Sequence, residues 1–179
     1  MASTKRILVP YRRRREQRTD YKKRLKLLLS GKPRLVVRFT NTKIIAQIIT
    51  FGSTGDTVLV AQDSTALKNH GWIYSFKNIP AAYLTGMLLG KKALQQGCSE
   101  AIFDTGFKLL PPKGRLAAFL QGAVEAGLLV PHGSKEIFST PERLQGEHIA
   151  QYLKSSPGAE TIMVQFKKIQ EKIKNNHGH

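Results

Sequence analysis

The chain has 179 residues, 41% of them apolar, which is about the length of one ordinary domain with enough apolar material for a single core. Its formal charge of +17 would attract polyanions, so nucleic acid or an anionic membrane is the natural counterpart. The apolar runs are far shorter than the roughly 20 residues of a membrane-crossing helix, and "MASTKRILVP" lacks the apolar stretch of a secretory signal. Because a single cysteine, Cys98, permits no internal disulfide, we expect a soluble protein of the cytoplasm.

Positive charge is concentrated in the first 33 residues, which carry 12 Lys or Arg against two acids and so +10 of the total. Within them, Thr19 or Asp20 can cap a helix that Gly31 and Pro33 end. One face of this helix carries an apolar stripe made of Tyr21, Leu25, Leu28 and Leu29. Because such a stripe needs a surface to pack on, we expect it to anchor a basic arm, residues 1–33, to the rest of the chain.

Three apolar, β-branched runs follow the arm and predict strands at about 34–40, 43–51 and 57–62. A polar turn at Asn41 and Thr42 separates the first two runs, and a glycine-rich turn separates the second from the third, so we expect an antiparallel meander. Neighbours such as Val36 and Val37 are both apolar, which predicts that part of the sheet is covered on both faces.

Two amphipathic helices and a short strand complete the expected core. "NIPAAYLTGMLLGKKALQQG" predicts a helix with Pro80 in its first turn, "EAIFDTG" a buried strand, and "KGRLAAFLQGAVEAG" a second helix. Gly86 and Gly90 each cost a helix about 1 kcal/mol relative to Ala, a cost that we expect a close approach of helix to sheet to offset. The order of elements predicts a right-handed crossover, and so an α/β domain over residues 34–133 with a mixed sheet of about four strands.

Residues 134–179 are expected to form a basic helical extension. "TPERLQGEHIAQYLK" predicts a helix from Thr140, and "TIMVQFKKIQEKIK", after an "SSPG" break, predicts another. The second helix carries a stripe of Ile162, Phe166, Ile169 and Ile173. This stripe fits two alternatives, docking on RNA or another protein and folding back on the chain's own core, and both stay open; membrane binding is the least favoured.

Little in the sequence suggests catalysis. Asp104 ends an expected strand, where active-site carboxylates often lie in α/β folds, but its place before Gly106 is more typical of a turn cap. The histidines have no metal-ligand spacing, and His177 and His179 are typical of a terminal tail. Neither a P-loop nor a dinucleotide-binding pattern is present. We therefore expect no metal, no cofactor and no enzymatic activity.

Basic residues recur beside aromatic ones in the expected loops. Arg38 precedes Phe39, Phe107 precedes Lys108, and Arg115 opens the second core helix. RNA-binding surfaces use this mixture, since cations neutralise phosphates while aromatic rings stack on exposed bases. Together with the arm, these pairs favour RNA as the counterpart over a membrane.

Two blocks closely resemble a known family. "PRLVVRFTNTKIIAQII" and then "KKALQQGCSEAIFDTGFKLLPPKGRLAAFLQGAVEAGL" resemble the large-subunit ribosomal protein that binds 5S rRNA, protein eighteen in the bacterial numbering and protein five in the eukaryotic one. The resemblance covers about residues 33 to 130, with both blocks in the family's order and spacing. The arginine-rich start and "KNIPAAYLTGMLLGKKAL" resemble the archaeal and eukaryotic branch, and the modest length the archaeal form.

This resemblance implies a ribonuclease-H-like translational-component fold and a non-catalytic protein that is a monomer within the large ribosomal subunit. It implies binding to 5S rRNA and to the large-subunit rRNA at the central protuberance, beside the other 5S-binding ribosomal protein and further proteins of that region. By position in the matched blocks and the arm, the RNA-binding residues would be Arg12, Arg13, Arg14, Arg15, Arg18, Lys22, Lys23, Arg24, Arg38, Asn41, Thr42, Lys43, Gly106, Phe107, Lys108, Lys113, Gly114 and Arg115.

Two other functions are weighed against this one. A general nucleic-acid-coating protein would explain the charge but would not distinguish one RNA from another. A metal-dependent nuclease would give Asp104 a catalytic role, yet a two-metal site needs several converging carboxylates, which the sequence does not suggest.

Overall fold

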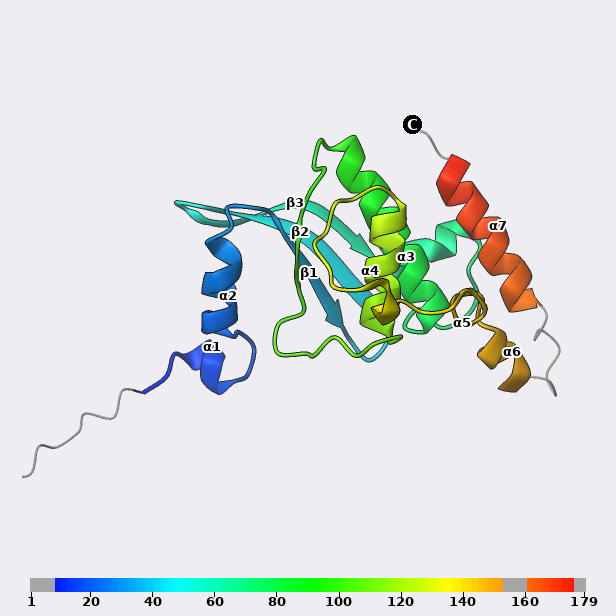
Figure 1. Ribbon diagram of the computed structural model, residues 1–179, viewed down its shortest axis with the longest axis horizontal. Helices are drawn as coiled ribbons and strands as arrows, with labels where there is room; N and C mark the ends of the chain where they lie inside the picture. The colour runs from blue at the N-terminus through cyan, green and yellow to red at the C-terminus, as the bar shows by residue number, and fades with distance from the viewer. Residues whose placement is uncertain (1–8, 153–160, 176–179) are drawn as a thin grey trace, which may run out of the picture.

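The computed structural model describes residues 9–152 and 161–175, and within these ranges the chain folds around one mixed, four-stranded sheet (Figure 1). Its strands are β1 (Arg34–Phe39), β2 (Ile44–Gly52), β3 (Gly55–Asp63) and β4 (Ile102–Asp104). Their order is β3-β2-β1-β4, with β4 parallel to β1 and the other neighbours antiparallel. The expected meander, the short fourth strand and the α/β class are confirmed, while the ribonuclease-H-like label stays a prediction.

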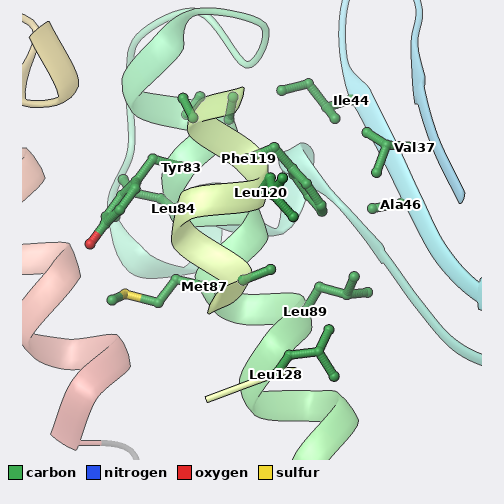
Figure 2. Packing of buried hydrophobic residues seen from close by; sticks show 14 of the residues in the cluster. Val37, Ile44, Ala46, Tyr83, Leu84, Met87, Leu89, Phe119, Leu120 and Leu128 are labelled. Atoms are coloured by element: carbon green, nitrogen blue, oxygen red, sulfur yellow. The ribbon is translucent and has the colours of Figure 1, made fainter. Parts of the chain in front are cut away.

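One face of the sheet packs on the helices α3 (Ile79–Gln95) and α4 (Arg115–Glu125), shown in green and yellow in Figure 1. Alternation along β1 and β2 turns apolar side chains to this face, and those buried there are Leu35, Val37, Ile44, Ala46 and Ile48. In Figure 2, Phe119 of α4 lies against Val37 and Ile44 of the sheet. Among the helices in the described ranges, none is both long and apolar enough to span a bilayer.

α3 and α4 cross in backbone contact at a pair of glycines. A Cβ on Gly86 would lie 2.1 Å from the carbonyl oxygen of Phe119, and a Cβ on Gly122 would lie 2.1 Å from that of Tyr83. Gly90 likewise faces Ala123 of α4 and Ala126, which follows it. The expected close approach therefore exists, but the expectation of a helix-to-sheet contact was wrong. The glycines allow one helix to approach the other, and this packing offsets their cost to α3.

The opposite face of the sheet is covered at one end by the arm. The arm forms two short helices, α1 (Arg12–Arg15) and α2 (Tyr21–Leu28), which lie in Figure 1 at the end of the sheet away from α5, α6 and α7. Val36 and Ile49 on this face are half-buried and line a hollow together with residues of the arm. The expected covering of both faces is thus confirmed only in part, by helices on one face and the arm on the other.

The segment after α4 is more broken than its sequence predicts. After α4, the 3₁₀ turn η2 (Lys135–Ile137) precedes α5. The other 3₁₀ turn of the described residues, η1 (Ser64–His70), lies earlier in the chain, between β3 and α3. In place of one helix from Thr140, the chain forms α5 (Pro141–Gln145) and α6 (Glu147–Tyr152). Gly146 separates them with a φ of +85°, a left-handed conformation that ends a helix and that glycine adopts most readily. The "SSPG" break, His177 and His179 lie outside the described residues.

The last helix, α7 (Thr161–Asn175), folds back on the core. Its apolar stripe is buried as part of the same apolar cluster as the sheet, through Ile162, Phe166, Ile169 and Ile173. The rings of Phe166 and Tyr83 lie 5.5 Å apart, and Gln170 donates to the Tyr83 hydroxyl at 2.8 Å. Tyr83 also donates to Glu125 of α4, and burial, with this carboxylate, raises the pKa of Tyr83. Of the two alternatives for the stripe, packing on the chain's own core is the one observed.

Candidate nucleic-acid interface

The arm helix α2 begins at a polar cap. Asp20 precedes the helix and accepts a hydrogen bond from the backbone N–H of Lys23 at 3.1 Å, which satisfies one of the unpaired donors of the first turn. Of the two caps that the sequence allowed, Asp20 is therefore the one used. Gly31 follows the helix with a φ of +69°. The cap fixes where the basic side chains of α2 begin, directly after the loop from α1.

The apolar stripe of α2 does not anchor the arm, so that expectation was wrong. No residue of α2 is buried, and Leu25 and Leu29 are 60% and 79% exposed. Tyr21 contacts Tyr11 with ring centroids 5.2 Å apart, which is a contact within the arm itself. The stripe therefore contributes little to holding the arm on the sheet domain.

Polar contacts hold α2 on the sheet domain instead. The ammonium group of Lys23 donates to the Thr105 hydroxyl at 2.9 Å and to the carbonyl oxygen of Gly106 at 3.0 Å. The guanidinium of Arg24 donates to both carboxylate oxygens of Asp56, at 3.0 and 2.9 Å. These charge-assisted bonds join the arm to the loop after β4 and to the start of β3.

We predict that replacing both exposed leucines with serine, in the double variant Leu25→Ser with Leu29→Ser, changes the free energy of unfolding by less than about 0.5 kcal/mol. Neither side chain loses a buried contact, because both lie largely in solvent. Urea denaturation followed by circular dichroism measures the change. A loss of about 2 kcal/mol would show instead that the two leucines do anchor the arm to the sheet domain.

Below the arm, a cluster of ion pairs lies at the sheet surface. Arg34 is 4% exposed, and its two terminal nitrogens bind different carboxylates, Asp104 at 3.0 Å and Asp56 at 2.9 Å. Asp56 is thereby shared with Arg24 of the arm. Since buried charges need partners, Arg34 and its two carboxylates form one structural unit to which the arm is attached.

Asp104 organises basic side chains at the end of β4. Its carboxylate binds Arg34 and accepts the backbone N–H of Gly106 at 2.8 Å, which is the turn-capping role that the sequence favoured. Arg38 donates to the Asp104 carbonyl oxygen at 2.8 Å, and its guanidinium packs against Gly106, where a Cβ would lie 3.1 Å away. Gly106, with a φ of +64°, thus leaves room for Arg38.

A hollow of about 200 Å³ opens between the arm and the sheet, and we call it the arm hollow. Its basic lining residues are Arg13, Arg18, Lys23, Arg24, Arg34 and Arg38, and its acidic ones are Asp20, Asp56 and Asp104. Five of these basic residues belong to the predicted RNA-binding set. Arg34 and Asp56 are not in the predicted set; the alternation of Arg34, Val36 and Arg38 along one strand is the sequence signal that indicates Arg34.

A second group of predicted residues meets around Phe39 at the end of β1. The Lys108 ammonium lies 5.6 Å from the ring centroid and the Arg115 guanidinium 5.0 Å from it, distances at which cations interact with an aromatic face. Lys113 and Gly114 come directly before α4, and the Lys113 backbone N–H donates to the carbonyl oxygen of Ile137. The two sequence blocks are therefore brought together in space.

The β1–β2 turn presents the remaining predicted residues. Asn41 and Thr42 are exposed, while Lys43 pairs with Asp63 at 2.7 Å. Burial alone would raise the pKa of Asp63, but the bonds from Lys43 and Thr65 hold that pKa below its ordinary value. The other predicted residues lie at the surface outside the arm hollow, namely Arg12, Arg14, Arg15, Lys22 and Phe107. That all these residues bind RNA stays a prediction.

Comparison with known proteins supports the family that the sequence blocks resemble. A family model described as "Ribosomal large subunit proteins 60S L5, and 50S L18" matches residues 5–108, from the arm to just beyond β4. The chain is 49% identical over 153 residues to large ribosomal subunit protein uL18 of Caldivirga maquilingensis, covering 85% of this chain and 73% of that protein. It is 46% identical over 155 residues to uL18 of Halobacterium salinarum, covering 87% and 84% respectively.

A third relative, uL18 of Methanoculleus marisnigri, is 49% identical over 158 residues, covering 88% of this chain and 90% of that protein. These relatives are archaeal, in agreement with the archaeal form that the arm and the length suggested. The expected location, the large ribosomal subunit of the cytoplasm, agrees with these matches. The chain belongs to the family of large-subunit ribosomal proteins described as 60S L5 and 50S L18.

Proposed function

We propose that the chain is a structural constituent of the large ribosomal subunit that binds 5S rRNA and attaches it to the large-subunit rRNA at the central protuberance. The observation that carries the proposal is the docking of a strongly basic arm onto the open face of the sheet. Lys23 and Arg24 fix α2 there, which sets the arginines of α1 beside a basic hollow. Such an arrangement supports many phosphate contacts along one RNA surface.

The cluster at Phe39 supports the same function in a different way. Lys108 and Arg115 stand over the Phe39 ring, and Phe107 beside them is 47% exposed. Aromatic rings and guanidinium planes stack on unpaired bases, which is how proteins read single-stranded loops of RNA. We therefore assign phosphate binding to the arm and contact with RNA loops to this cluster.

The three segments have separate roles in this proposal. Residues 1–33 bind RNA, residues 34–133 form the platform, and residues 134–179 extend it, with the apolar stripe of α7 turned to the core. The outer face of α7 carries Lys167, Lys168 and Lys172 and is available to RNA or to a protein of the central protuberance. The neighbouring 5S-binding ribosomal protein is among the proposed partners, and the chain acts as a monomer within the subunit.

The proposed role is not catalytic. In the metal-dependent nuclease alternative, Asp104 would bind metal together with other carboxylates. Here the Asp104 carboxylate accepts hydrogen bonds from the Arg34 guanidinium and from the Gly106 backbone, which are structural contacts. Magnesium-dependent cleavage of RNA that is lost in Asp104→Asn would favour the nuclease instead.

Binding measurements with 5S rRNA test the proposal. We expect tighter binding to 5S rRNA than to tRNA or duplex DNA, with a log–log salt dependence that corresponds to on the order of 6 to 10 phosphate contacts. Gel shift and fluorescence anisotropy at several salt concentrations measure both quantities. Equal affinity for all three nucleic acids would contradict the proposal and favour a general coating protein.

Removing residues 1–18 separates the arm from the platform. We predict at least about tenfold weaker binding to 5S rRNA and a smaller salt dependence, because the deletion removes the arginines of α1. The melting temperature should change little, since Asp20, Lys23 and Arg24 remain to hold α2. Unchanged affinity for 5S rRNA would show that the arm contacts something else.

A further inference from the structure

The arm hollow has more positive charge than its own carboxylates neutralise. Its lining holds six Lys or Arg side chains against three Asp side chains, and one further carboxylate, Glu16 outside the lining, pairs with Arg18 at 3.3 Å. Lys23 donates to the uncharged Thr105 hydroxyl and Gly106 carbonyl, and Arg13 donates to the Thr19 hydroxyl at 2.9 Å. These contacts satisfy donors without balancing charge. The hollow is therefore a concave site with an excess of cations, which attracts an anion more strongly than a flat surface with the same charges.

One cation of the lining is held away from solvent. Arg34 is 4% exposed, and within residues 9–152 and 161–175 its Nε atom is buried and has no hydrogen-bond partner. Its two terminal nitrogens are oriented by Asp104 and Asp56, so the guanidinium is fixed before any ligand arrives. A preorganised cation at the floor of a hollow loses little freedom on binding an anion.

We infer that the arm hollow is a binding site for a single phosphodiester group of the RNA backbone, held between Arg13 and Arg18 of the arm and the arginines of β1. The inference rests on the proposed function and names one contact within it. A hollow of about 200 Å³ has room for several water molecules, and so for a tetrahedral oxyanion. Guanidinium groups bind such an oxyanion with paired, charge-assisted hydrogen bonds.

A polynucleotide fits the surroundings better than free phosphate does. The four consecutive arginines of α1, residues 12–15, lead directly into the loop that borders the hollow. Arg14 and Arg15 are exposed and lie outside the hollow. A chain of phosphates with one group seated in the hollow can place its neighbours on these arginines, whereas a single phosphate ion uses the hollow alone.

Two double variants with equal charge make the test specific. Arg13→Ala with Arg18→Ala removes two arginines at the rim of the hollow, and Arg14→Ala with Arg15→Ala removes two from the same arm but outside it. We expect the first variant to weaken binding to 5S rRNA about tenfold more than the second, because it loses charge-assisted bonds to a seated phosphate. The full-length chain is used throughout.

Ethylation interference identifies the phosphate. In 5S rRNA with about one phosphate per molecule neutralised by ethylation, one position or two adjacent positions should block binding by the unchanged chain and by the Arg14, Arg15 variant. The same positions should become neutral for the Arg13, Arg18 variant. The inference would be overturned if both variants lost interference at these phosphates, or if neither variant did.

Inorganic phosphate serves as the second probe. At equal ionic strength, phosphate should raise the melting temperature above that in chloride for the unchanged chain and the Arg14, Arg15 variant, but not for the Arg13, Arg18 variant. A phosphate effect without any single sensitive position in the RNA would make the hollow a site for free anions and overturn the inference. Failure of all three proteins to bind 5S rRNA would contradict the proposed function, whereas binding without a difference between the variants contradicts the hollow alone.

Discussion

Replacing Gly122 with alanine is expected to lower the free energy of unfolding by about 3 kcal/mol. The new Cβ would lie 2.1 Å from the Tyr83 carbonyl oxygen and 3.1 Å from the Met87 backbone nitrogen, both of which belong to α3. Neither backbone atom can move without moving the helix. Since α3 and α4 together cover one face of the sheet, separating them would also disturb the packing of Phe119 against Val37, seen in Figure 2.

The sign of this effect separates close packing from local helix preference. In an unconstrained helix, alanine in place of glycine would stabilise by about 1 kcal/mol. Gly86→Ala should behave like the Gly122 variant, because a Cβ on Gly86 meets Phe119 of α4 at the same distance. Gly133→Ala is the matched control, since no atom lies within 4 Å of the Cβ that it adds. Urea denaturation measures the free energy of unfolding of each variant. If either helix variant were as stable as the unchanged chain, the close backbone contact between α3 and α4 would be contradicted.

The strands and core helices could be predicted because their signals are local. Pro80 in a first turn and Gly97 after the last turn mark the ends of α3, and the structure places the helix between them at Ile79–Gln95. The three β-branched runs predict the meander to within about two residues, because strands half-buried on a sheet favour those residues. Elements whose limits depend on nearby residues are thus accessible to sequence analysis.

Partners between distant elements were predicted less well. Gly86 and Gly90 indicated a close approach in α3, but nothing in the sequence said whether a sheet or a helix would occupy the space. The leucines of α2 indicated an apolar anchor, whereas Leu25 and Leu29 are exposed and Lys23 and Arg24 make the contacts. A stripe on a helix shows which face is apolar, and the partner of that face is decided by the rest of the fold.

The candidate site was likewise predicted only in part. The basic residues of the arm stand out by charge alone, but the side chains that position them do not. Arg34 and Asp56 resemble ordinary strand and turn residues in the sequence, and they gain a role only where the sheet brings them to Asp104 and Arg24. Long-range pairing, 70 residues apart for Arg34 and Asp104, therefore defines the platform on which the arm lies.

Replacing Asp104 with asparagine is expected to lower the free energy of unfolding by about 3 kcal/mol, because the change leaves Arg34 buried with one carboxylate in place of two. The asparagine carbonyl can still accept the backbone N–H of Gly106, so the turn after β4 is kept. The variant therefore tests the loss of the negative charge separately from the loss of the turn. Glu100→Gln is the matched control. It removes the carboxylate that pairs with Lys32 at 2.6 Å, where both side chains are more than one-third exposed, and should cost less than about 1 kcal/mol.

Salt and a double variant identify the cause of the Asp104 effect. The cost of Asp104→Asn should persist at high salt, since buried pairs are weakly screened, while any cost of Glu100→Gln should disappear. Adding Arg34→Met to Asp104→Asn should recover part of the loss, because it removes the buried charge that lacks its second partner. If the two substitutions add without recovery, Arg34 and Asp104 are not energetically coupled. The attachment of α2 to the sheet domain would then rest on Asp56 and on the Lys23 contacts.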